Sequence, residues 1–264
     1  MPADMAALAA DLAAESAVTR ALVAGLDEAG WHTPTPSAGW DIADQISHLA
    51  YFDEVTVRSA TDPDAFLAER AAAEAGNGIN PDTIAARFRD RTGTQLLDWF
   101  GTARAGLIRT FAGLDPRARL PWFGPDMSAA SSLTARIMET WAHTQDIADA
   151  LGVTREPTGR LRHVAHIGVG ARGYSYAVHG KTMPPAPVRI ELTAPDGTQW
   201  TWGPHDAADR VTGPALDFCL LVTQRRHRDD LNLGIEGPAA AGWMAIAQAF
   251  AGAAGTGRPR SAHA

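Results

Sequence analysis

Two short segments of the sequence carry side chains whose types and spacing suit a metal site. Glu139 and His143 are four residues apart, so on a helix they project from one face, one turn apart. His48 lies in a second segment that reads as an amphipathic helix. Two imidazoles and one carboxylate match the protein ligands of a catalytic zinc centre and the facial triad of non-haem iron. The residue types therefore point to a divalent metal with an open coordination position.

Each of these side chains also has an ordinary structural explanation. A Glu–His pair at this spacing is common on a solvated helix surface, and a histidine on an inward helix face is often a core residue with satisfied nitrogens. Metal sites in bundles, however, are built from inward side chains on facing helices. Three further histidines compete as ligands, but no carboxylate accompanies them at helical spacing: His163, His166 and His179.

The elements that must position these residues are predicted to be long helices. Apolar residues recur at spacings of three and four through the first part of the chain, Asp41 has the character of an N-cap, and loops rich in proline and glycine separate the segments. The expected helices cover residues 4–29, 41–60, 63–75, 82–113, 128–151 and 158–178, with a loop at 76–81. Such segments predict a helical bundle over residues 1–182.

The pattern changes after residue 182. Residues 188–193 alternate apolar and charged side chains like a half-exposed strand, and residues 199–202 complete a hairpin. Helices at 214–222 and 239–250 flank a strand at 231–235. We expect a small α+β domain over residues 183–252 and a disordered tail over residues 253–264. The predicted fold class is α+β, with an N-terminal helical bundle.

Composition excludes several other classes of protein. The 264 residues carry a formal net charge of −7, which gives no general attraction to nucleic acid or to anionic lipid. No apolar run is long enough to cross a membrane, and the N-terminus lacks the pattern of a signal peptide, so we expect a cytoplasmic protein. The sequence sets no oligomeric state. Its single cysteine, Cys219, lies in an apolar segment and is predicted to be a packing residue, so a metal must use histidine and carboxylate.

The segments WDIADQISH (residues 40–48) and ETWAHTQD (residues 139–146) together resemble the metal-binding pattern of the DinB-like superfamily. They are most similar to its mycothiol-dependent maleylpyruvate isomerase branch and to related actinobacterial metal-binding proteins. The resemblance covers nearly the whole chain, since that branch also joins a four-helix bundle to a small α+β domain. It implies that His48, Glu139 and His143 bind a divalent metal, usually zinc, with nickel or iron as alternatives.

The resemblance also implies a reaction. Because Cys219 is unsuited to act as the nucleophile, a low-molecular-weight thiol such as mycothiol would come from solution. Coordination to the metal would deprotonate this external thiol. In an isomerase the thiolate adds to a conjugated cis alkene, the adduct rotates about the former double bond, and elimination returns the trans product and the thiol. In an S-transferase the adduct is released. The substrate is a small electrophile in either case.

Two further residues are candidates for the catalytic machinery. Asp146 lies three residues beyond His143, where a carboxylate could orient a ligand histidine, although an ordinary charge on the helix surface fits equally. Arg225 best matches an arginine that the family uses to bind substrate carboxylate, a task suited to a guanidinium fork. Gln224 stands where the family usually has glycine, and a solvated basic helix end is the alternative. Trp122 and Phe123 are candidates to line the mouth of the pocket.

The sequence leaves alternative functions open. The same metal site could activate water in a hydrolase, or polarise a carbonyl in a lyase or cyclase, without any thiol. A metal-containing binding protein or sensor without turnover is a third reading.

Overall fold

The computed structural model describes residues 4–75 and 80–261, and most of the loop expected at 76–81 lies outside these ranges. The chain divides into two compact units, Met1–Arg155 and Glu156–Ala264.

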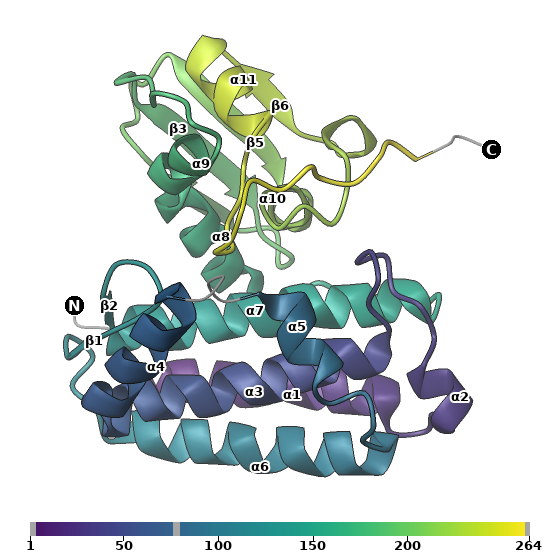
Figure 1. The fold of residues 1–264 in the computed structure, drawn as a ribbon. Coiled ribbons are helices and arrows are strands. Elements are labelled where there is room, and N and C mark those ends of the chain that lie inside the picture. The colour runs from purple at the N-terminus through teal and green to yellow at the C-terminus, as the bar shows by residue number, and fades with distance from the viewer. Residues whose placement is uncertain (1–3, 76–79, 262–264) are drawn as a thin grey trace. The chain divides into compact units, whose positions relative to one another are not determined.

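The first unit is built on four long helices that run alongside one another (Figure 1). These are α1 (Met5–Val23), α3 (Ile42–Thr61), α6 (Gly93–Ala112) and α7 (Ala129–Ala150). Both α1 and α3 contact α6 and α7, so the four helices enclose a common interior. Their apolar faces fill it with clusters that include Ile46, Leu107 and Ile137, each fully buried. The predicted four-helix bundle is confirmed.

Polar caps decide where these helices begin. The Asp41 carboxylate accepts a hydrogen bond from the Asp44 backbone N–H, and Asp44 returns the contact in a capping box that starts α3. The Ser128 hydroxyl oxygen caps α7 by accepting a hydrogen bond from the N–H of Ser131. Since α3 and α7 carry the candidate ligands, these caps set where each ligand-bearing helix begins.

Shorter elements link the long helices. They are α2 (Glu28–Trp31), α4 (Pro63–Ala75), α5 (Pro81–Ala86) and the two-stranded β1 (Arg119–Leu120) and β2 (Met127–Ser128). The single helix predicted at 82–113 is wrong: α5 ends at Ala86, and a capping box between Thr92 and Gln95 starts α6 at Gly93. The helix predicted at 4–29 likewise splits into α1 and α2, because Asp27 caps a separate turn.

The second unit is a mixed sheet with helices. The strand order is β4-β3-β5-β6, formed by β3 (Val188–Thr193), β4 (Gln199–Trp202), β5 (Asp209–Pro214) and β6 (Gly234–Glu236). Its helices are α8 (Leu161–Gly170), α9 (Arg172–Val178), α10 (Ala215–Val222) and α11 (Pro238–Met244), with a short 3-10 turn at Arg228–Asp230. β3 pairs antiparallel with β4 as expected, and parallel with β5, which was not predicted. The α+β fold class is confirmed.

The boundary between the units differs from the prediction. The helix expected at 158–178 is divided at Ala171 into α8 and α9, and α8 packs on α10 of the second unit. Gly168 permits this packing, because a Cβ there would lie 2.7 Å from a side-chain atom of Val222. The boundary therefore falls after Arg155 instead of after residue 182. The core of the second unit needs the apolar face of α8, which residues 183–252 alone do not supply.

The predicted disordered tail is also corrected for its described part. Residues 253–261 form no helix or strand, but their backbone is tied to the second unit at several points. Gly255 N–H donates to Gln248 Oε1 at 2.9 Å, and Ser261 N–H donates to Asp230 Oδ2 at 2.8 Å. Buried and half-buried side chains thus hold a segment whose composition predicts no structure.

Candidate metal centre

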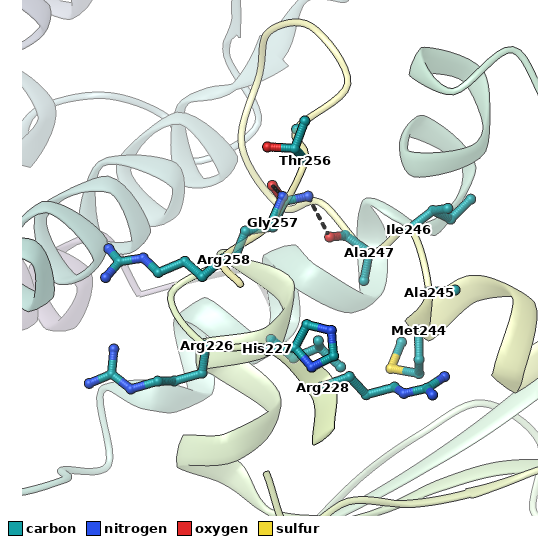
Figure 2. Close-up of a pocket in the computed structure, with 13 residues that line it drawn as sticks. Arg226, His227, Arg228, Met244, Ala245, Ile246, Ala247, Thr256, Gly257 and Arg258 are labelled. Atoms are coloured by element: carbon teal, nitrogen blue, oxygen red, sulfur yellow. Dashed lines mark hydrogen bonds between the residues drawn. The ribbon is translucent and has the colours of Figure 1, made fainter. Parts of the chain in front are cut away.

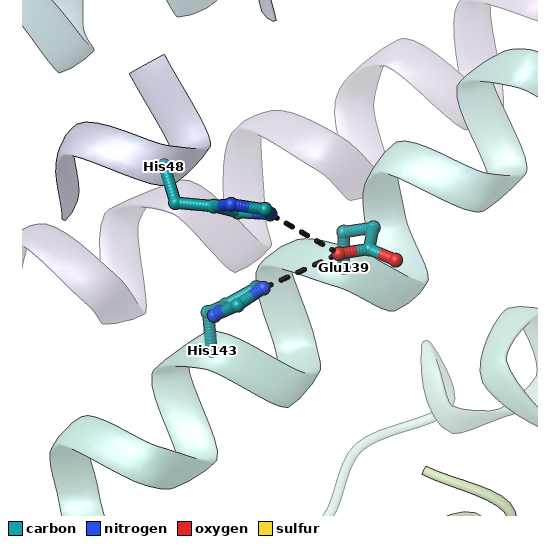
Figure 3. Close-up of side chains that lie close together, drawn as sticks. All are labelled: His48, Glu139 and His143. Atoms are coloured by element: carbon teal, nitrogen blue, oxygen red, sulfur yellow. Dashed lines mark hydrogen bonds and ion pairs between the residues drawn. The ribbon is translucent and has the colours of Figure 1, made fainter. Parts of the chain in front are cut away.

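His48, Glu139 and His143 lie together in the first unit. His48 projects from α3 and the other two from successive turns of α7, and Figure 3 shows both rings directed at the Glu139 carboxylate. Glu139 Oε2 lies 3.3 Å from His143 Nε2 and 3.7 Å from His48 Nε2. One ligand atom from each residue falls within 4.8 Å of the others, and within the described ranges this is the one such group of three or more metal-ligating side chains.

Aromatic rings surround the two histidines. The Phe52 ring lies 4.6 Å from the His48 ring, centroid to centroid, and the Trp40 ring lies 5.3 Å from His48 and 6.0 Å from His143. Phe52 follows His48 by one turn of α3, and Trp40 precedes the cap of that helix. These rings exclude water from the flanks of the site, which strengthens electrostatic interactions within it.

Burial and neighbouring charge set the protonation of the site. Burial lowers the pKa of His48 to about 4, assisted by His143 and only partly opposed by Glu139. Burial alone would raise the pKa of Glu139, but its contacts with His143 and His48 and the charge of Arg136 outweigh burial and hold that pKa well below its usual range. At neutral pH His48 is therefore neutral and Glu139 ionised. A divalent cation requires these forms of its ligands.

A hydrogen-bonded chain reaches His143 from the side away from Glu139. His143 Nδ1 lies 2.5 Å from Gln45 Oε1, Gln45 Nε2 donates to Thr35 Oγ1 at 2.9 Å, and the Thr35 hydroxyl donates to the Trp40 carbonyl at 2.9 Å. Sequence reasoning missed Gln45. The available signal was its position three residues before His48, which places both on one face of α3.

The donor set fits a divalent metal. Gln45 Oε1 can only accept, so His143 Nδ1 carries the proton of the neutral ring, and Nε2 presents a lone pair to the Glu139 carboxylate. The second histidine, His48, has no hydrogen-bond partner for its buried Nδ1 among the described residues. The nitrogen lone pair and the carboxylate oxygen thus face one another, which is the arrangement of donor atoms that a divalent cation binds.

A buried ionic network crosses the bundle about one helical turn from the site. Arg104 on α6 forms a salt bridge with Asp53 on α3 at 2.6 Å, and Arg136 on α7 contacts the same carboxylate at 3.3 Å. Arg104 also donates to Ser16 on α1 and to Thr140 on α7. Arg136 lies one turn before Glu139, and its positive charge contributes to the low pKa of that carboxyl. Sequence analysis did not single out these residues.

The other candidates of the first unit take different places. Asp146 is fully buried and accepts a hydrogen bond from Ser37 Oγ at 3.0 Å, and Gln45 Oε1 lies at Nδ1 of His143. Trp122 and Phe123 pack with Phe66 in an apolar cluster that also contains Phe52, the neighbour of His48.

In the second unit, Arg225 donates to the Thr223 carbonyl at 2.7 Å. A cavity of about 290 Å³ opens beside it, and its lining includes the basic neighbours Arg226, His227 and Arg228 and the tail residues 255–258, as Figure 2 shows. Arg225 is not among the lining residues. Cys219 is buried, and burial raises the pKa of its thiol, which agrees with the predicted packing role.

Comparison with known proteins places these features in context. The family model described as the mycothiol maleylpyruvate isomerase N-terminal domain matches residues 12–148, which contain all three candidate ligands. A second model, described as wyosine base formation, matches residues 184–233. Uncharacterized proteins from two strains of Mycobacterium tuberculosis are each 46% identical over 256 residues, covering 97% of this chain and 100% of the relative.

Solved structures share the fold. Two crystal structures of mycothiol-dependent maleylpyruvate isomerase, one of them a mutant with a histidine replaced by alanine, match with TM-scores of 0.59 and 0.53 at 15% and 17% identity. In both cases the match covers 90% of this chain and 96% of the other. None of the helices in the described ranges has the length and apolar character needed to span a bilayer.

Proposed function

Because the chain belongs to the mycothiol maleylpyruvate isomerase N-terminal domain family, we propose that it is a metal enzyme that uses a low-molecular-weight thiol. His48, Glu139 and His143 hold the metal, with zinc first and nickel or iron as alternatives. The observation that carries the proposal is the convergence of these three side chains, with His48 neutral and Glu139 ionised.

The proposed reaction is isomerisation or S-transfer on a small electrophile. A divalent cation in this site supplies positive charge that favours the thiolate form of an external thiol such as mycothiol. The chain supplies no accessible thiol for this step, since its single cysteine, Cys219, is buried in the second unit with a raised pKa. In the isomerase version, the thiolate adds to one carbon of a conjugated cis alkene to give a delocalised anion, the adduct rotates about the former double bond, and loss of the thiolate restores the alkene as trans.

The protein contributes positioning and exclusion of water. Trp40 and Phe52 cover the flanks of the imidazoles, and Asp146 supports the ligand helix α7 through Ser37. Arg225 remains our candidate for binding a substrate carboxylate through its guanidinium fork. We place the reaction in the cytoplasm, where small thiols are kept reduced. The mycobacterial relatives support an actinobacterial source for this protein, in which mycothiol would be available.

The first test is the metal content of untagged protein by elemental mass spectrometry. We expect about one zinc, nickel or iron per chain in the wild type, and loss of the metal in His48→Ala and Glu139→Ala, since two remaining ligands bind a cation weakly. Glu69→Ala, which removes an exposed carboxylate of α4, is the control and should keep the metal. Wild-type protein that remains free of metal after exposure to all three ions would contradict the proposal.

Turnover then separates the candidate functions. Metal-loaded protein is offered activated cis alkenes with and without a thiol, and products are identified by mass spectrometry and NMR. Conversion that requires the thiol supports the isomerase or transferase, whereas conversion without it supports a hydrolase, lyase or cyclase. A bound metal with ligand binding and no conversion of any substrate favours the binding protein.

A further inference from the structure

Gln45 stands at the centre of the hydrogen-bonded chain beside the metal centre, and its amide orientation is determined by its partners. The Trp40 carbonyl can only accept, so the Thr35 hydroxyl must donate its proton to it at 2.9 Å. Thr35 Oγ1 must then accept the hydrogen bond that joins it to Gln45, also at 2.9 Å. The amide end of Gln45 that faces Thr35 is therefore the NH2 group, and Oε1 faces His143.

This orientation fixes the tautomer of His143. An amide oxygen has no proton to give, so the bond between Gln45 Oε1 and His143 Nδ1 requires a proton on Nδ1. A neutral imidazole carries one N–H, which leaves the lone pair on Nε2, the atom 3.3 Å from Glu139 Oε2. The atom with the lone pair is thus the one that faces the other candidate ligands.

The second histidine lacks such a partner. Nδ1 of His48 is buried without a hydrogen bond among the described residues, and its ring is held by contacts with Phe52 and Trp40. Aromatic contacts fix the plane of a ring but do not select which nitrogen is protonated. The two imidazoles of the site therefore differ. The tautomer of His143 is fixed before a metal binds, whereas the tautomer of His48 is set when the metal binds.

We propose that Gln45 is a positioning residue of the metal centre, which holds His143 in the Nδ1–H tautomer through the chain from the Trp40 carbonyl and Thr35. The proposal deepens the proposed function and rests on the same metal site. Gln45 is fully buried on α3, one turn before His48, so a single helix contributes one ligand and the partner that orients another. Partners of this kind typically change metal affinity by about 10- to 100-fold when removed.

Metal affinity and the tautomer of the metal-free protein test the proposal separately. Zinc affinity is measured by competition with a chromophoric chelator, and the protonated nitrogen of His143 is identified by NMR of ¹⁵N-histidine protein at mildly alkaline pH. We expect the proton on Nδ1 in the metal-free wild type. Gln45→Leu should lose this preference and weaken zinc binding by about 10- to 100-fold. Gln45→Glu should retain both, because a carboxylate also accepts from Nδ1–H.

Two further variants separate orientation from general loss of structure. Thr35→Val removes the hydroxyl that fixes the amide, so the Nδ1–H tautomer should become mixed and zinc affinity should fall by less than in Gln45→Leu. Gln145→Leu is the matched control: it removes another buried glutamine of the bundle, one that donates to Asp149 and not to a candidate ligand, and it should keep the wild-type tautomer and affinity.

Several outcomes would overturn the proposal. One is a proton on Nε2 of His143 in the metal-free wild type. This measurement does not depend on whether any variant folds. Others are an unchanged zinc affinity in Gln45→Leu, or an equal loss in Gln45→Leu and Gln145→Leu. Failure of the wild type to bind any metal would instead remove the proposed metal function, while the NMR result would still decide the role of Gln45 in orienting His143.

Discussion

His48 is the residue of the site whose charge the fold controls most directly. An imidazole in water titrates near neutrality, but burial beside His143 lowers the pKa of His48 to about 4. His48 therefore becomes protonated near pH 6.5 in the unfolded chain. In the folded chain it becomes protonated only at a much lower pH. Above about pH 6.5 neither state is protonated, and the full contribution of neutral His48 to stability is present. That contribution is lost as the pH falls from about 6.5 toward about 4.

This difference predicts acid sensitivity of the metal-free protein. The free energy of unfolding should fall by about 2 kcal/mol between about pH 7.5 and about pH 5 through His48 alone. Urea unfolding followed by circular dichroism measures it, and His48→Asn provides the comparison because it keeps a polar side chain that does not titrate. The variant should show a shallower loss than the wild type over this range. Parallel pH profiles of the two proteins would disprove the assignment.

At the scale of elements, close approach explains why residue 93 is a glycine. The structure places Gly93 as the first residue of α6, against the buried ring of Trp31. A Cβ at this position would lie 2.1 Å from Trp31 Nε1. The break between α5 and α6 thus lets α2 pack its tryptophan onto the start of a bundle helix.

Gly93→Ala should therefore destabilise the protein. The buried Trp31 ring would have to move, and overpacking of this kind costs about 1–3 kcal/mol. Gly106→Ala in the same helix is the matched control, since a Cβ there meets no atom within 4 Å. It should raise stability by about 0.5–1 kcal/mol, because alanine favours helix. Thermal and urea unfolding of the two variants give the comparison, and equal shifts of the same sign would refute the packing argument.

At the scale of the whole molecule, the two units are stabilised in different ways. The first unit has a charged group in the middle of its bundle: Arg104 on α6 bonds to Asp53 on α3, to Ser16 on α1 and to Thr140 on α7. Burial lowers the pKa of Arg104, and the charge of Asp53 opposes that shift. One guanidinium therefore links all four long helices. The second unit is instead joined by its mixed sheet and by the packing of α8 on α10.

Loss of the Asp53 charge should weaken the whole bundle. Asp53→Asn would leave Arg104 and Arg136 without their shared buried carboxylate, and breaking such a pair costs about 3–5 kcal/mol. Glu69→Gln is the control, because it removes an exposed salt bridge with Arg58. Loss of such a surface pair lowers the free energy of unfolding by less than about 1 kcal/mol. Urea unfolding of the metal-free proteins measures both. Similar losses in the two variants would show that the buried network does not support the bundle.

The sequence by itself determined the features that depend on neighbours along the chain. The Asp41 and Ser128 caps, the helices at 42–61, 63–75 and 129–150, and the strands at 188–193 and 199–202 follow from local spacing and side-chain chemistry. The same local pattern placed Glu139 and His143 on one face of a helix. It also identified the residue types of a metal site and the family resemblance.

Only the tertiary structure decided which of these faces meet. The approach of α3 to α7 brings His48 to Glu139, places Gln45 at Nδ1 of His143, and pairs Asp53 with two arginines. β5 and the boundary at Arg155 also depend on distant partners, β3 for the strand and α10 for the helix after the boundary. Hydrogen bonds and packing between segments far apart in sequence leave no periodic signal along the chain. Neither residue of such a contact stands out locally, because its role depends on a partner that only the fold brings beside it.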